Sequence, residues 1–371
     1  MRLAAFELDH WLEAHRGARY DLAASTGPRW TIRELFALAG EAEREAFLDG
    51  PVSYCPNAGH DDLRQAIGDL HGVAADDVQI VTGAAEGLLV LFFLAAEPGA
   101  NIVVPAPCFP TFVEVPRGLG LDVRTYELRP ENRFAVDVDE VARLIDGNTK
   151  LLLVNTPHNP SGAVVDLATL TALHDLAVDR GVQLVVDEVY HPIYHGEPRA
   201  SAAELPHCTV LGDFSKAFSL SGLRTGWIVD RDRTRHPSYL DARSYFTVSN
   251  AMPGERLAVL AARHAEQILA RGREIAAANL ASLDRFFEAH PDRFSWVRPE
   301  GGFTTFPALA AGGDARPLCE AAAAKGVVLG PGDCFGRPAH LRIGFGACTE
   351  GFDDALALTA EAVRESLAVA S

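Results

Sequence analysis

The chain has 371 residues, of which 48% are apolar and 22% are charged, and its formal net charge is −17. These values are typical of a globular chain with more than one hydrophobic core and argue against a disordered, collagen-like or coiled-coil protein. Because no block of consecutive lysines and arginines occurs, we do not expect nucleic acid as a partner.

The sequence indicates neither secretion nor membrane spanning. The first residues, MRLAAFELDHWLEAH, lack a basic start followed by an uninterrupted apolar core, and no segment approaches 18 apolar residues. We therefore expect a cytoplasmic protein without a membrane partner. The six cysteines form no CxxC pair and no His/Cys cluster, which favours reduced thiols and predicts no metal site.

Short apolar runs predict the strands of an α/β domain. The runs alternate with helix-like segments such as residues 166–181, which close at Gly181. This alternation predicts a mostly parallel, buried sheet whose strands are joined by crossover helices. The runs lie within residues 78–87, 151–162, 182–190, 208–216 and 225–230.

The C-terminal third has a different pattern. Residues 253–290 are rich in Ala, Leu, Arg and Glu, which predicts long helices that link one domain to the next. After them, short strands and helices are expected to alternate around Gly/Pro turns. The simplest partition is an N-terminal segment (1–45) that joins a C-terminal small domain (256–371), with a large domain (46–255) between them.

The segment TGAAEG (82–87) follows the first predicted strand and begins an apolar helix. The backbone N–H groups of Gly83, Ala84 and Ala85 would then face outward at the positive end of a helix, where phosphate binds without a charged side chain. Any strand-to-helix turn can use Gly and Ala, so this segment alone does not establish a phosphate site.

Two polar residues follow predicted strands, at the sheet edge where open parallel sheets bind ligands. Asp187 ends the run VQLVVD, and a buried carboxylate there needs a cation or a donor such as a pyridinium nitrogen. A helix N-cap in DEVY explains it equally well. Asn159 precedes a proline that fixes the backbone and can aim the amide into a site, although Asn-Pro pairs also begin ordinary turns.

The segment DFSKAFSLSGLRTGW contains two cations among small and apolar residues. A desolvated Lys216 would have a lowered pKa and a neutral amine that can form a Schiff base. Arg224 has a planar fork that suits two phosphate oxygens. Two surface cations on a loop are the alternative, which the apolar surroundings disfavour. Together with the preceding groups, these residues complement pyridoxal 5′-phosphate.

The sequence also resembles the fold-type I pyridoxal-phosphate enzymes, in particular the class I/II aminotransferases. The most specific match is SKAFSLSGLRTGW, and the likeness extends from YDLAAST to LRIGFG. It implies a large sheet domain with a smaller α/β domain and an internal aldimine at Lys216. The likeness also implies the remaining cofactor contacts: phosphate at Ser215, Arg224 and residues 83–85, ring nitrogen at Asp187, and ring hydroxyl at Asn159 and Tyr190.

Three further roles rest on the same resemblance. PAPCFPTF implies that Phe109 stacks on the cofactor ring, and HLRIGFG implies that Arg342 grips the substrate α-carboxylate together with Asn159. VSYCPNAG implies that Tyr54 reaches the phosphate of a neighbouring subunit, and hence a homodimer with shared sites. The family pattern commonly has Ser, Thr or Gly where this chain has Asp213, a carboxylate that would repel phosphate unless it points away or meets a cation.

The resemblance implies an aminotransferase that moves the α-amino group of an amino acid to a keto acid. Relatives resembling capreomycidine synthase, which cyclise or eliminate from arginine-like substrates, and arginine oxidases share the same motifs and remain alternatives. A transcription-regulator sensor domain would need a basic helix-turn-helix extension, and a degenerate copy would have lost cofactor contacts. For the substrate side chain, Trp30, His191 and Tyr194 are candidate pocket walls, although ordinary packing explains them too.

Overall fold

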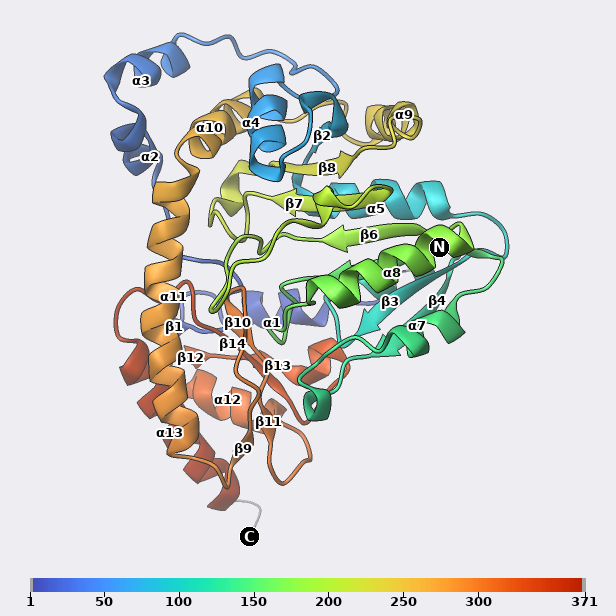
Figure 1. Ribbon diagram of the computed structural model, residues 1–371. Helices are drawn as coiled ribbons and strands as arrows, with labels where there is room; N and C mark the ends of the chain where they lie inside the picture. Colours follow the sequence, from blue (N-terminus) through green and yellow to red (C-terminus); the bar gives the residue numbers. More distant parts are fainter. Residues whose placement is uncertain (1–2, 369–371) are drawn as a thin grey trace.

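The computed structural model describes residues 3–368, and a seven-stranded sheet forms their centre (Figure 1). The strand order is β2-β8-β7-β6-β5-β3-β4, and β8 runs antiparallel to both of its neighbours while the other strands share one direction. The strands are β2 (Val78–Val81), β3 (Asn101–Ala106), β4 (Asp122–Glu127), β5 (Thr149–Asn155), β6 (Gln183–Asp187), β7 (Cys208–Asp213) and β8 (Gly226–Asp230).

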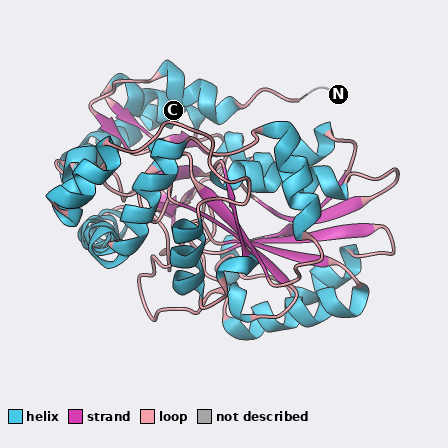
Figure 2. Ribbon diagram, turned by 90° about the horizontal axis from the view of Figure 1, so that it is seen from above, coloured by secondary structure: helices cyan, strands magenta, loops and turns pink. Residues whose placement is uncertain are grey.

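The sheet is buried on both faces, which explains the near-continuous apolar runs of its central strands. Alternate residues of β5 enter two different cores, with Leu152 on one face and Leu153 on the other. Figure 2 shows helices on both sides of the twisted sheet. The first face packs on α4 (Asp61–His71), α7 (Val138–Leu144) and α8 (Leu167–Arg180), and the second on α5 (Gly83–Ala95), α6 (Thr111–Gly118) and α9 (His236–Phe246).

The five predicted strand runs and the predicted crossover helix are confirmed. Helix α8 begins after Asp166, whose carboxylate accepts a hydrogen bond from the Thr169 N–H (2.7 Å), and it ends at Gly181 with φ +65°. These are the usual start and stop signals of a helix. Strands β3 and β4 were not predicted. Pro105 interrupts the β3 pattern, and it lies where the pairing with β5 has already ended and only β4 pairs with β3.

The C-terminal part is a smaller α/β unit connected by two helices, α10 (Met252–Arg263) and α11 (Ala265–Glu288), which confirms the predicted long helices. Helix α11 runs from the sheet domain along the whole C-terminal part (Figure 1). The remaining elements of the C-terminal part are α12 (Arg316–Ala324), α13 (Phe352–Ala368), β9 (Phe294–Ser295), β10 (Thr304–Thr305), β11 (Ala308–Leu309), β12 (Val327–Val328), β13 (Gly330–Pro331) and β14 (Leu341–Gly344).

The N-terminal segment divides between the two parts. Helix α1 (Glu7–Ala14) and strand β1 (Tyr20–Asp21) contact the C-terminal part, where β1 pairs with β12 and the Trp11 indole donates to the Leu329 carbonyl (2.8 Å). Helices α2 (Ile32–Ala39) and α3 (Glu41–Leu48) lie near α10 instead (Figure 1). The domain boundaries at 45/46 and 255/256 stay a prediction.

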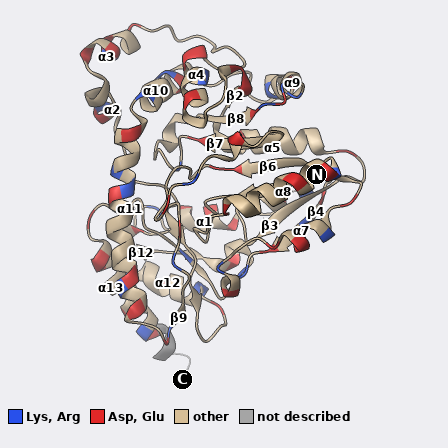
Figure 3. Cartoon of the chain, viewed as in Figure 1, with Lys and Arg blue, Asp and Glu red and all other residues tan. Residues whose placement is uncertain are grey.

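The charges of the chain are dispersed. Figure 3 shows acidic residues spread over helices of both parts, with Lys and Arg scattered among them. Within residues 3–368, no helix combines the length and apolar character needed to cross a bilayer.

Candidate active site

A cavity of about 220 Å³ opens at the carboxyl ends of the parallel strands. Strands β5, β6 and β7 each end at this cavity, and the turn after β2 closes one side, so residues far apart in sequence meet there. Of the predicted site residues, those that line it are Ala84, Ala85, Phe109, Asn159, Asp187, Tyr190, Ser215, Lys216 and Arg224.

Lys216 is the lysine of this cavity. The chain has two others, and both are paired at the surface: Lys150 with Glu97 (2.6 Å) and Lys325 with Glu365 (2.8 Å). The Lys216 ammonium donates to the Ser25 hydroxyl (2.8 Å). Burial lowers the pKa of its amine, and the carboxylates of two residues in the cavity wall, Asp213 and Asp187, partly offset that effect. A lysine with a lowered pKa supplies the neutral amine that reacts with aldehydes.

Asp187 ends β6 and is only 5% exposed. Its carboxylate accepts one hydrogen bond, from the Val189 N–H (3.1 Å), and a turn rather than a helix follows it. The N-cap explanation of this residue therefore does not apply. The pKa of the Asp187 carboxyl is raised to about 7, chiefly by burial and also by the Asp213 charge, while the hydrogen bond from Val189 and the Lys216 ammonium oppose the shift. A cationic ring nitrogen beside Asp187 would supply the partner that it lacks.

The start of α5 and the Arg224 side chain form one end of the cavity. Arg224 Nη1 donates to the Ser215 hydroxyl (3.3 Å) and to the Ser221 carbonyl (3.1 Å). Gly83 has φ +73°, and a Cβ at this position would lie 2.6 Å from Arg224 Nη2. The positive φ favours glycine here, and a side chain at this position would displace the end of the Arg224 side chain. The guanidinium, a hydroxyl and the helix N-terminus therefore converge in a way that suits a phosphate group; we refer to Gly83, Ala84, Ala85, Ser215 and Arg224 as the phosphate cup.

Arg342 does not line the cavity itself and lies behind Asn159, which does. It belongs to β14 and is 2% exposed; its Nη1 donates to the Asn159 amide oxygen (3.1 Å) and its Nη2 to the Ala23 carbonyl (2.6 Å). Its buried Nε has no hydrogen-bond partner among the described residues, so one donor of the fork is unused. The Tyr190 hydroxyl, whose pKa is raised to about 12 by burial, donates to the Ser25 carbonyl (3.0 Å).

Asp213 is buried at the end of β7, in the cavity wall. One of its carboxylate oxygens accepts a hydrogen bond from the Ser215 N–H (2.9 Å), which fixes the loop that carries Lys216. Its negative charge also raises the pKa of the Lys216 amine. The carboxylate is thus occupied by its own loop and faces a cation, which reduces the conflict with a phosphate expected from the sequence.

Tyr54 lies outside this cavity. It is 84% exposed, in the loop between α3 and α4, and it does not line the cavity of its own chain. Its role in a neighbouring subunit stays a prediction. The candidate pocket walls do not line the cavity either: Trp30 lies under the Arg271 guanidinium, and the His191 ring is hydrogen bonded to the Tyr194 hydroxyl (2.8 Å).

The sequence did not single out several residues that contact the site. Ser25, in the resemblance segment YDLAAST, contacts Lys216 and Tyr190. The Asn155 amide donates to the Asp187 carbonyl (3.0 Å) and accepts from the Asn159 N–H (2.8 Å). Asn155 lies in NTPHNPSG, where a second asparagine directly after a strand was an available signal. Ser25 carried no such signal, because only the fold places it at the cavity.

Comparison with known proteins gives consistent matches over nearly the whole chain. The family model described as aminotransferase class I and II matches residues 38–357. The capreomycidine synthase of Streptomyces vinaceus is 32% identical over 371 residues, covering 97% of this chain and 94% of that protein.

Two solved structures are similar along their full length. A PLP-dependent aminotransferase from Streptococcus suis superposes with a TM-score of 0.92 at 28% identity, covering 98% of this chain and 99% of that one. The PLP-dependent cyclase OrfR superposes with a TM-score of 0.91 at 27% identity, covering 99% and 98%.

Pyridoxal 5′-phosphate is the cofactor that these matches establish. The residues of the cavity fit it. The glycine turn lets Arg224 approach the start of α5, the Asp187 carboxylate accepts from one backbone N–H and from no side chain of the described residues, and Lys216 has an amine of lowered pKa.

Proposed function

Because the chain belongs to the family of class I and II aminotransferases, we propose that it moves the α-amino group of an amino acid to a keto acid with pyridoxal 5′-phosphate as cofactor. The observation that carries the proposal is the position of Lys216. Its amine lies in the cavity with Asp187 and Arg224, while the other two lysines of the chain are paired elsewhere.

In this proposal each group in the cavity has one role toward the cofactor. The Lys216 amine would hold the aldehyde carbon, and Asp187 would hold the ring nitrogen in its protonated form. Asn159 and Tyr190 bind the ring hydroxyl, and Phe109 lies against the ring. The phosphate is bound by the phosphate cup. The bound cofactor supplies an electron sink that accepts the electron pair left when the substrate Cα–H bond breaks.

The protein groups then handle the substrate and the proton. Arg342, with an unused donor at Nε, orients the substrate carboxylate, and its contact with Asn159 fixes the guanidinium at the edge of the cavity. The Lys216 amine would take the substrate α-proton at its Nζ and would hold that proton for return to the product. Burial of the amine favours the neutral form that this step requires.

Cyclisation or elimination on an arginine-like amino acid is the second candidate function. The similarity to a capreomycidine synthase and to the cyclase OrfR supports it. A cavity of about 860 Å³ beside Ser25 supports it too, because Asp9 and Asp21 contribute to its lining. Both carboxylates are close enough to the Arg342 guanidinium for their charges to raise its pKa, against the lowering by burial. A substrate whose carboxylate is held by Arg342 could present a cationic side chain to those carboxylates.

One assay separates the two candidates. The purified enzyme is incubated with a panel of amino acids, including aspartate and arginine, with and without a keto acid. Transamination predicts at most one turnover per site without the keto acid and steady turnover with it. Multiple turnovers without a keto acid, with a cyclic or eliminated product, would establish the second candidate instead.

We also infer a homodimer with shared sites and a cytoplasmic location. The exposed Tyr54 side chain supports the first inference, because an aromatic residue 84% exposed beside the buried contacts of Asn57 is available to a second subunit.

A further inference from the structure

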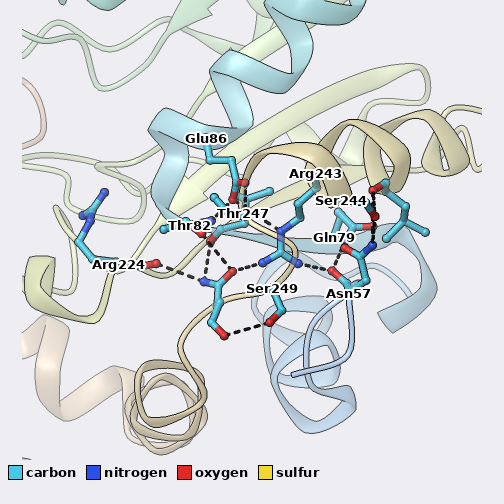
Figure 4. Close-up of polar contacts among 12 residues, drawn as sticks. Asn57, Gln79, Thr82, Glu86, Arg224, Arg243, Ser244, Thr247 and Ser249 are labelled. Atoms are coloured by element: carbon cyan, nitrogen blue, oxygen red, sulfur yellow. Dashed lines mark hydrogen bonds and ion pairs between the residues drawn. The ribbon is translucent and has the colours of Figure 1, made fainter. Parts of the chain in front are cut away.

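Arg243 is one of the two largest fully buried side chains of the described residues, and it does not line the cofactor cavity. It lies on α9 and is 0% exposed. A guanidinium without solvent contact is costly unless it meets acceptors and a counter-charge. Its polar partners lie on three separate segments: the start of α5, which carries part of the phosphate cup, the loop after α9, which contacts Arg224, and the loop that carries Tyr54 (Figure 4).

The first segment is the start of α5. Arg243 Nε lies 3.6 Å from the carboxylate of Glu86, whose side chain is 5% exposed. The same carboxylate accepts a hydrogen bond from the Thr82 N–H (2.5 Å), directly before Gly83, and another from the Thr247 hydroxyl (2.5 Å). The guanidinium thus fixes the carboxylate that fixes the glycine turn.

The second segment is the loop after α9, which contacts Arg224 through Asn250. Arg243 Nη2 donates to the amide oxygen of Asn250, and the Asn250 amide nitrogen donates to the Val81 carbonyl (3.0 Å) and to the Arg224 carbonyl (3.2 Å). Arg224 has φ +48°, a conformation that non-glycine residues rarely adopt and that needs support from its surroundings. In Figure 4 the Arg224 carbonyl makes one of the drawn hydrogen bonds, while its guanidinium extends away from the other labelled residues.

The third segment is the loop that carries Tyr54. Arg243 Nη1 donates to the Asn57 carbonyl, which also accepts from the Gln79 side chain (3.2 Å) on β2. Glu255 lies near the same guanidinium and accepts a hydrogen bond from the His60 N–H (2.8 Å), so a second buried carboxylate fixes the end of this loop. One guanidinium therefore connects both sides of the phosphate cup with the loop predicted to reach the neighbouring site.

We propose that Arg243 is a positioning residue for the cofactor phosphate: through Glu86 and Asn250 it holds the glycine turn and Arg224 in the arrangement that binds the phosphate group. Arg243 itself touches no cofactor atom. The proposal rests on the cofactor and not on the reaction that follows, so it stands whether the chain transaminates or cyclises its substrate.

The experiment compares two ligands that differ only in the phosphate. Dissociation constants of pyridoxal 5′-phosphate and of pyridoxal are measured by absorbance titration of the full chain, stripped of cofactor. The double variant Arg243→Met with Glu86→Gln removes both charges of the closest ion pair, so that the Glu86 carboxylate is not left without its cation, while Glu255 stays as a buried carboxylate nearby. We expect pyridoxal 5′-phosphate to bind about tenfold more weakly or worse, while pyridoxal affinity changes by less than about twofold.

A matched control is Arg235→Met. Arg235 also pairs with a fully buried carboxylate, that of Asp230 (3.2 Å), but at the opposite end of β8. We expect this control to lower the melting temperature without changing the affinity ratio, defined as the dissociation constant of pyridoxal divided by that of pyridoxal 5′-phosphate. Arg243→Lys keeps the cation and tests the proposal if the double variant does not fold. Because an ammonium cannot reproduce the planar fork of the guanidinium, this variant should also lower the affinity ratio.

The ratio decides the outcome. A ratio that falls in the Arg243 variants and not in the control supports the positioning role. A ratio equal to wild type in Arg243→Lys or in the double variant, whatever the melting temperature, would mean that Arg243 only stabilises the fold, and the proposal would be wrong.

Discussion

At the scale of single residues, two buried carboxylates, those of Asp187 and Asp213, line the same cavity as Lys216. Burial raises the pKa of Asp187 to about 7, so the cofactor-free protein disfavours its charged form. Its unfolded pKa is near 4, so between about pH 4 and pH 7 the folded state binds more protons than the unfolded state, and stability falls as the pH rises.

Asp187→Asn should therefore gain stability over wild type as the pH rises. In the absence of cofactor, we expect the variant to gain a few kcal/mol relative to wild type between pH 5 and pH 8. Denaturant unfolding of both proteins at the two pH values measures the difference in their free energies of unfolding. Glu188, whose pKa burial also raises to about 7, is present in both proteins and cancels in the first approximation. If the difference in unfolding free energy between variant and wild type were the same at pH 5 and pH 8, the raised pKa of Asp187 would be contradicted.

Asp213→Asn should lower the pKa of the Lys216 amine. Asparagine can still accept the hydrogen bond from the Ser215 N–H, so the loop is retained while the charge beside Lys216 is lost. The charges that remain near the amine are those of Asp187, Arg224 and Arg342. In the cofactor-loaded enzyme we expect the pH midpoint of the visible absorbance change to fall by about one unit. A midpoint that does not move, or that rises, would show that Asp213 does not act on this amine.

Sequence alone identified most residues of the cavity, and the reason is local. Lys216 and Asp187 are unusual because charged residues rarely end or follow buried strands, and Arg224 is unusual because it lies among small and apolar residues just before one. The residues next to Ser25 and Arg243 in the sequence do not make either of them stand out. Their positions depend on contacts with residues more than 150 positions away, Lys216 for Ser25 and Asn57 for Arg243, which no local pattern encodes.

At the scale of elements, the glycine turn before α5 determines how closely Arg224 approaches. Gly83→Ala introduces a Cβ at φ +73° and 2.6 Å from Arg224 Nη2. The backbone strain costs about 1–2 kcal/mol, and the displaced guanidinium should weaken cofactor binding in addition. We expect lower affinity for pyridoxal 5′-phosphate, measured by equilibrium dialysis.

Gly181→Ala is the control for that substitution. Gly181 ends α8 with φ +65°, and nothing lies within 4 Å of an added Cβ. It should lose similar stability and bind the cofactor as wild type does. If both variants bound the cofactor equally well, the close contact between the turn and Arg224 would have no bearing on the phosphate.

The elements themselves were predicted unevenly. Strands β5, β6 and β7 are apolar over their length because both faces are covered, and their runs are easy to recognise. Strand β4 is an edge strand with a mostly half-buried pattern, and β3 contains a proline, so neither carries the signal of a central strand. The many two-residue strands of the C-terminal part are fixed by tertiary contacts and not by local sequence.

At the scale of the whole molecule, the predicted homodimer can be tested by mixing subunits. Lys216→Ala and Tyr54→Ala subunits should each be nearly inactive alone. If Tyr54 serves the neighbouring site, a hybrid dimer contains one site with both residues intact, and mixing followed by exchange should restore part of the activity. A mixture no more active than its components would exclude a shared site that depends on Tyr54.

The central claim is that Lys216 carries the cofactor, and the small number of lysines makes it directly testable. The loaded enzyme is reduced with borohydride, digested, and analysed by mass spectrometry for the peptide that retains the cofactor. We expect a single modified peptide containing Lys216, and none in Lys216→Ala. Modification at Lys150 or Lys325, or a loaded enzyme that yields no modified lysine, would contradict it.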